Sequence, residues 1–127
     1  MILLDTNVII DLLNKEDDSR WDLLNQEDCV ICGIVISELY SGIKSKKEEK
    51  AVELFVNSLD WLSVEEGDWQ KIGQLISNFK KNGLSVPVQD AVLAYLSIKY
   101  ECKILTLDKH FPMMKVLDDR IGLWEIC

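Results

Sequence analysis

The chain has 127 residues, of which 48% are apolar and 28% charged, and its formal net charge is −8. This length and composition predict a single domain over residues 1–127 that buries an apolar core without disulfides. The acidic balance argues against a protein that holds long duplex DNA on a broad basic face. It is compatible with a short contact to RNA beside bound divalent cations, and with a basic protein partner.

Short apolar runs alternate with longer amphipathic stretches along the chain, which is the pattern of a parallel α/β sheet. We expect strands at residues 1–4, 29–32, 61–64, 103–106 and 122–125. We expect helices at residues 6–13, 17–26, 36–43, 46–59, 68–81 and 87–98. Asn82-Gly83 is a common helix stop and Pro87 a common helix start, so they bound the last two of these helices.

Three of the expected helices carry apolar stripes that predict which side chains face the core. Each stripe repeats at intervals of three and four residues, as one face of an α-helix requires. The stripe residues are Ile36, Leu39, Tyr40 and Ile43 in the third helix, Ala51, Leu54, Phe55 and Leu59 in the fourth, and Val88, Ala91, Val92 and Tyr95 in the sixth.

Cys29 and Cys32 have the C-x2-C spacing of half a zinc site. No second pair completes such a site, because Cys102 and Cys127 lie far apart and the only histidine is His110. We therefore expect free thiols in a reducing cytosol, with the first two buried in a strand. No apolar run approaches the ~20 residues that span a bilayer, and the start of the chain lacks the basic region of a signal peptide. The expected location is the cytoplasm.

Four acids fall where a parallel sheet places its ligands, which is outside the carboxyl ends of the strands. Asp5 and Asp108 directly follow expected strands, and Glu38 and Asp90 lie in the first turns of helices. Taken singly, each also fits an ordinary role as a loop, capping or solvated helix acid. Gathered in one cleft they would repel, since two anions ~4 Å apart cost on the order of 4 kcal/mol at an effective dielectric of 20.

A bound cation would neutralise such a cluster. Oxygen ligands without a required histidine favour Mg²⁺ or Mn²⁺, as one or two ions. The chemistry suited to this kind of site is phosphodiester cleavage. One metal would lower the pKa of an attacking water, and the other would stabilise the leaving oxygen.

Four segments resemble, in order, the motifs of PIN domains, and especially those of the nucleases in VapC-type toxin–antitoxin pairs. They are DTNVIID at residues 5–11, ISELYSG at 36–42, DAVLAY at 90–95 and TLDKHF at 106–111. The resemblance covers essentially the whole chain. It implies a three-layer α/β/α fold with a central, mostly parallel sheet of about five strands. It also implies a Mg²⁺- or Mn²⁺-dependent endoribonuclease, the toxin of a type II toxin–antitoxin system, that forms a homodimer.

The same resemblance implies a small antitoxin that blocks the site and binds operator DNA. Carried over position by position, the metal-binding and catalytic acids are Asp5, Glu38, Asp90 and Asp108. Thr6 and Thr106 match positions that support the first and fourth acids, and Asn7 matches a polar position beside the site. Asp11, common in the family's first helix, is interpreted as peripheral.

The chain departs from the family pattern at His110, where another acid often stands; this histidine is either a phosphate contact or a surface residue. The segment at residues 83–89 follows the pattern loosely. The lysines Lys44, Lys46 and Lys47, with Lys50 nearby, are either a solvated helix face or a contact strip for RNA phosphates.

Two other functions remain open on the sequence alone, and a third is disfavoured by the residue at one position. A non-catalytic interaction module on the same fold would be expected to lack one or more of the four acids. A receiver-like phosphoacceptor domain would need an acidic pair after the first strand, where only Asp5 stands. An aspartate-nucleophile phosphatase would need an acid at the position that Asn7 occupies.

Overall fold

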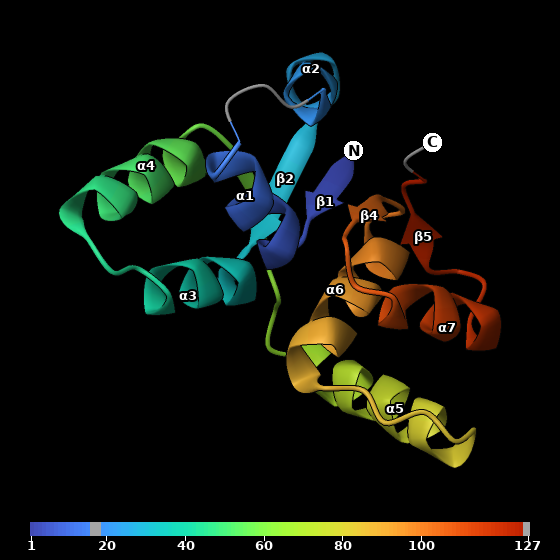
Figure 1. The fold of residues 1–127 in the computed structure, drawn as a ribbon. Coiled ribbons are helices and arrows are strands. Elements are labelled where there is room, and N and C mark those ends of the chain that lie inside the picture. The colour runs from blue at the N-terminus through green and yellow to red at the C-terminus, as the bar shows by residue number, and fades with distance from the viewer. Residues whose placement is uncertain (16–18, 126–127) are drawn as a thin grey trace.

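Five short parallel strands form the centre of the protein in the computed structural model, which describes residues 1–15 and 19–125 (Figure 1). They lie in the order β3-β2-β1-β4-β5, and every neighbouring pair is parallel. The strands are β1 Ile2–Leu4, β2 Cys29–Cys32, β3 Asp60–Leu62, β4 Lys103–Leu105 and β5 Gly122–Leu123. The expected parallel sheet of about five strands is therefore confirmed.

Helices cover both faces of this sheet, which confirms the three-layer α/β/α fold. They are α1 Thr6–Leu13, α2 Arg20–Gln26, α3 Gly33–Ser41, α4 Lys46–Asn57, α5 Asp68–Lys81, α6 Val88–Lys99 and α7 His110–Leu117. From β1 the chain moves outward through β2 to β3, and it then returns to the other side of β1 for β4 and β5. Right-handed crossovers in opposite directions put their helices on opposite faces. In Figure 1, α3 and α4 lie to the left, and α5, α6 and α7 to the lower right.

The core is centred on the strands β1, β2 and β4. Every residue of β1 and β2 is buried, because helices pack on both faces of a parallel sheet. This is why continuous apolar runs locate these strands in the sequence. Cys29, Cys32 and Cys102 are free, as predicted, and the expected burial of Cys29 and Cys32 is confirmed. Cys102 is buried as well, and burial raises the pKa of the Cys32 thiol to about 11. Cys127 lies outside the described residues.

Two glycines meet specific backbone requirements. Gly83 has a φ of 85° and follows α5, where its amide donates to the carbonyl of Lys80 and the amide of Leu84 donates to that of Phe79. This is a Schellman motif, which favours glycine at the left-handed position. At Gly122, a Cβ atom would lie 2.3 Å from the carbonyl oxygen of Cys102, so no side chain fits where β5 begins.

Two predicted stripes were each wrong at one residue, although Leu39 is buried and the other large members, Ile36, Ile43, Phe55 and Leu59, pack against the core. Tyr40 of α3 is 42% exposed and Leu54 of α4 is 66% exposed. The residues that α4 buries are Val52 and Val56, which form a second apolar stripe beside the predicted one. Periodicity alone could not choose between adjacent stripes, because the neighbouring helices decide which one is covered. Val88, in the first turn of α6, is also exposed.

Several element boundaries also differ from the predicted ones, and α7 was not predicted at all. The third helix runs from Gly33 to Ser41 rather than over residues 36–43. The start predicted for the second helix, at residues 17–18, lies outside the described residues. No helix in the described parts of the chain combines the length and hydropathy that crossing a membrane requires.

Candidate active site

The sheet changes its winding direction between β1 and β4, and this point defines the candidate site. A crevice forms outside the carboxyl ends of the strands at such a switch point. Asp5 directly follows β1, and its backbone amide donates to the carbonyl of Leu105 at the end of β4 (3.0 Å). The residues that follow the two strands therefore lie side by side.

Asp5 is a buried carboxylate held by neutral donors. Its side chain is 6% exposed and caps the N-terminus of α1. Its Oδ1 accepts from the amide of Thr6 (2.8 Å), and its Oδ2 accepts from the Thr106 hydroxyl (2.7 Å) and the Asn7 amide group (3.4 Å). Burial raises the pKa of Asp5; these hydrogen bonds oppose the rise, and the negative charge of Asp108 adds to it.

Thr6, Asn7 and Thr106 link the strand ends through their side chains. The Thr6 hydroxyl donates to Oε1 of Glu38 on α3 (3.0 Å). The Thr106 hydroxyl accepts from the backbone amide of Asp108 (3.0 Å) while it donates to Asp5. The Asn7 side chain donates to the Thr106 hydroxyl (3.4 Å) and accepts from the backbone amide of Leu107 (3.1 Å). The three residues fix the acids after β1 and β4 and the acid on α3.

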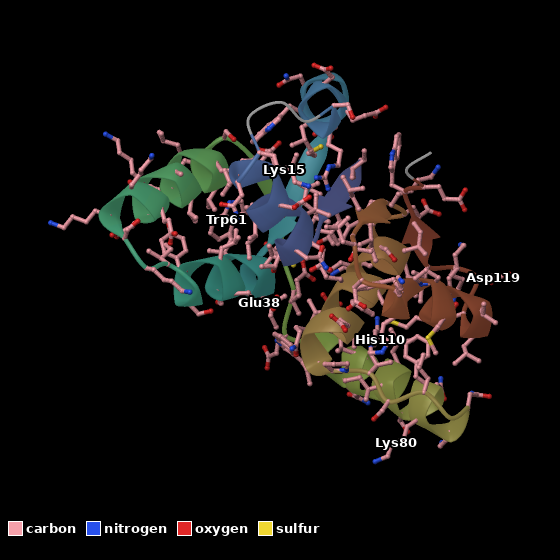
Figure 2. The ribbon with its side chains drawn as sticks, viewed as in Figure 1. Lys15, Glu38, Trp61, Lys80, His110 and Asp119 are labelled. Carbon is pink, nitrogen blue, oxygen red and sulfur yellow. The ribbon has the colours of Figure 1, made fainter. Side chains whose placement is uncertain are left out.

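The structure brings the four predicted acids together. Asp90 lies in the first turn of α6 and is half-buried. Burial raises its pKa to about 6, and the charges of Asp108, Asp5 and Glu38 contribute to the rise. Figure 2 places Glu38 and His110 at the lower end of the sheet in that view, where the strands finish.

Three of the side chains converge closely enough to share a cation. The potential ligand atoms of Asp90, Asp108 and His110 all lie within 4.8 Å of one another. Asp108 is fixed by the backbone amide of His110, which donates to its Oδ1 (2.9 Å). Two carboxylates and an imidazole, with the carboxylates of Asp5 and Glu38 nearby, are a donor set that fits a divalent metal ion.

The predicted lysine cluster lies apart from these acids. Lys44, Lys46 and Lys47 are exposed at the turn between α3 and α4 and in the first turn of α4. Lys44 and Lys47 line a groove formed by α1, α3 and α4, and none of the four acids lines that groove.

A second buried carboxylate, Asp68, was not singled out from the sequence. It begins α5, is 5% exposed, and accepts from the Lys99 ammonium (2.7 Å), the Tyr95 hydroxyl (2.6 Å) and the amide of Glu65 (2.9 Å). These bonds hold its pKa well below the usual range, with the largest effect from Lys99. Tyr95 and Lys99 are four residues apart on α6 and so share a face, which is the only signal the sequence offers.

The family model described as PIN domain matches residues 2–117 of this chain. VapBC2 from Rickettsia felis, bound to a DNA fragment from its promoter, aligns with a TM-score of 0.82 at 21% identity over 98% of each chain. DNA-bound VapBC from Salmonella typhimurium gives 0.82 at 22% identity, over 99% of this chain and 98% of that one. A toxin–antitoxin complex from Klebsiella pneumoniae gives 0.69 at 17% identity, over 85% of this chain and 87% of that one.

These structures share the fold of this chain at low sequence identity. No curated protein is similar enough in sequence to serve as a relative. The match to the family model covers almost the whole chain, from the first strand to the end of α7. The protein belongs to the PIN domain family.

Proposed function

We propose that the protein is a Mg²⁺- or Mn²⁺-dependent endoribonuclease and the toxin of a type II toxin–antitoxin pair. The observation that carries this proposal is the convergence of Asp5, Glu38, Asp90 and Asp108 at the switch point of the sheet. Among residues 1–15 and 19–125, none of the four forms an ion pair with a lysine or arginine. Uncompensated carboxylates in a cleft are the arrangement that a cation stabilises.

A bound divalent cation would supply positive charge that activates water for attack and stabilises the charge developing on the phosphodiester. The chain's own residues orient the ligands. Thr106 and Asn7 hold Oδ2 of Asp5, and Thr6 holds Oε1 of Glu38. The amide of His110 holds Oδ1 of Asp108. Polar partners of this kind fix the direction in which a carboxylate presents its free lone pairs.

The choice of RNA as substrate extends this proposal beyond the acids themselves. Lys44, Lys46 and Lys47 are exposed, and they would add phosphate contacts for a part of the RNA that extends away from the cleft. Because the protein as a whole is strongly acidic, contact with RNA would be confined to the metal site and this strip.

The partners belong to the same proposal. A similarly folded chain occurs in a toxin–antitoxin complex, and two others occur in complexes with DNA. We infer a small antitoxin that covers the carboxylates, and a homodimer of the toxin. Light scattering of the purified chain, alone and after co-expression with the product of the adjacent gene, tests both assemblies.

The decisive experiment for the activity is cleavage of structured RNAs with Mn²⁺, with and without EDTA. The wild-type protein should cleave, EDTA should stop cleavage, and Asp5→Asn should be inactive. Asp60→Asn is the matched control, because Asp60 is an exposed acid on the edge strand β3. Equal cleavage by the Asp5 variant would contradict the mechanism.

The main alternative is a non-catalytic interaction module on the PIN fold. Retention of all four acids argues against it, and so does their placement around one crevice. Absence of cleavage together with absence of metal binding in calorimetry would favour it. The receiver-like alternative is excluded for two reasons. The family match is to a different fold, and the strand order β3-β2-β1-β4-β5 differs from the 2-1-3-4-5 order of a receiver-like domain.

A further inference from the structure

His110 is the only histidine of the chain, and it stands at the start of α7 where it reaches the carboxylates. We propose that its imidazole is a metal ligand, so that Asp90, Asp108 and His110 form a metal position with mixed nitrogen and oxygen coordination. This inference rests on the proposed metal-dependent function. A nitrogen ligand also leads to a prediction of which divalent ion the site prefers, whereas the four acids alone do not distinguish Mg²⁺ from Mn²⁺.

The geometry is close to that of a coordination shell. Metal–ligand distances of roughly 2.0–2.2 Å put two ligands on opposite sides of an ion about 4.2 Å apart. The ligand atoms of Asp90, Asp108 and His110 lie within 4.8 Å of one another, so a small side-chain adjustment would bring all three onto one ion.

The three ligand atoms are also available. Among the described residues, no donor is assigned to the Asp90 carboxylate and no partner to the His110 ring, whose residue bonds through its backbone amide. Asp108 uses Oδ1 for that amide, which leaves Oδ2.

The ring nitrogen changes the expected selectivity. Imidazole binds first-row transition ions such as Mn²⁺ and Co²⁺ more strongly than it binds Mg²⁺, which prefers oxygen ligands and retains water. The site is therefore expected to prefer Mn²⁺ and Co²⁺ over Mg²⁺.

The single histidine makes a direct test possible in the full chain with any histidine tag removed. Electron spin echo spectra of the Mn²⁺-loaded protein should show modulation from a directly coordinated ¹⁴N nucleus. The modulation should disappear in His110→Ala and persist in Lys109→Ala, the exposed neighbour. Circular dichroism of both variants checks that they remain folded.

Calorimetry provides the second measurement. His110→Ala should weaken Mn²⁺ binding roughly tenfold or more and change Mg²⁺ binding much less, because the lost ligand is a nitrogen. His110→Asp should shift the preference back towards Mg²⁺.

Three results would overturn this inference. Wild-type protein that binds Mn²⁺ without nitrogen modulation would exclude the ligand, as would equal Mn²⁺ affinity in His110→Ala. If either result is obtained, weaker RNA binding by His110→Ala in the absence of metal would identify the histidine as a phosphate contact. In these cases Asp5-dependent cleavage would still support the proposed function, whereas a wild-type chain that binds no metal would overturn both.

Discussion

Asp5 and Asp68 are both buried carboxylates at the N-termini of helices, but they differ in the charge that surrounds them. The donors to Asp5 are neutral, and the charged group that acts on it is the anion Asp108, so its pKa is raised. Asp68 accepts from the ammonium of Lys99, so its pKa is lowered. Both carboxylates are therefore buried. The difference is that Asp68 pairs with a positively charged side chain, whereas the donors to Asp5 in the candidate active site are neutral.

Asp68 also helps to position the acids of the candidate active site. Asp68 bonds α5 to α6 through Tyr95 and Lys99, and α6 carries Asp90 in its first turn. Asp68, which is neutralised by Lys99, thus holds α6 in place, and α6 in turn brings Asp90 to the crevice. If this comparison is right, changes to the two regions should separate activity from stability.

The largest expected effect is the loss of activity in Asp5→Asn. The rate of RNA cleavage should fall by more than the roughly 10–100-fold that loss of an outer-shell partner costs, because a proposed metal ligand itself is weakened. The Tm of the metal-free variant should not fall, since a repulsive charge is removed. A large drop in Tm would assign Asp5 a structural role and break the comparison.

A smaller loss is expected from Thr106→Val, which keeps the shape of the side chain and removes its hydroxyl. Asp5 then loses its shortest hydrogen bond, and the amide of Asp108 loses its acceptor. Cleavage should slow by roughly 10–100-fold. Ser85→Ala, at an exposed position outside the site, is the control. Unchanged rates at saturating metal would show that the threonine does not orient the acids.

The converse experiment is Asp68→Asn, which leaves Lys99 without its buried carboxylate partner. Thermal unfolding should shift to a clearly lower temperature, because one member of a buried pair has been removed. At temperatures well below Tm, RNA cleavage should persist. Cleavage lost without any change in Tm would mean that Asp68 belongs to the site.

The two regions should also respond in opposite directions to acid. The lowered pKa of Asp68 stabilises the fold above its unfolded value of about 4, and this contribution is lost as the pH falls further. The pKa of Asp90 is raised to about 6, so in the metal-free protein its contribution to stability falls as the pH rises from about 4 to about 6. The dependence of Tm on pH should become weaker below pH 4 in Asp68→Asn, and weaker above pH 4 in Asp90→Asn. Identical profiles for both variants would contradict the assignment.

The smallest effect is expected at the lysine strip. Replacing Lys44, Lys46 and Lys47 by alanine should weaken RNA binding and reduce its dependence on salt concentration, without changing metal affinity. Lys71, Lys80 and Lys81, which are exposed on α5, provide a matched triple-alanine control. Unchanged RNA affinity in the triple variant would show that these lysines are an ordinary solvated surface.

The sequence identified the parts of the fold that are encoded locally. Strands β1, β2 and β4 are buried on both faces, so their apolar runs are visible without knowledge of their neighbours. The range of α5 was predicted correctly, because Asn82-Gly83 marks its end. The PIN resemblance, confirmed by the family match, selected four acids among 22.

Other features depend on contacts that no local pattern encodes. The phase of the α4 stripe is set by the helices that cover it, and the pairing of Asp68 with Lys99 joins residues 31 positions apart. The helix α7 was missed although Phe111 and Met114 have helical spacing and are buried. The convergence of His110 with Asp90 likewise became visible only in three dimensions.

The position of β4 next to β1 also determines when the carboxylate cluster can assemble during synthesis of the chain. The first strand leaves the ribosome well before its partner Lys103–Leu105, and the acid that follows this partner, are translated. Asp5 and Glu38 must therefore wait for Asp90 and Asp108 before the four can meet. A nascent chain that lacks β4 has no assembled carboxylate cluster, so the ribosome and messenger that produce it are not exposed to one until this strand has been translated.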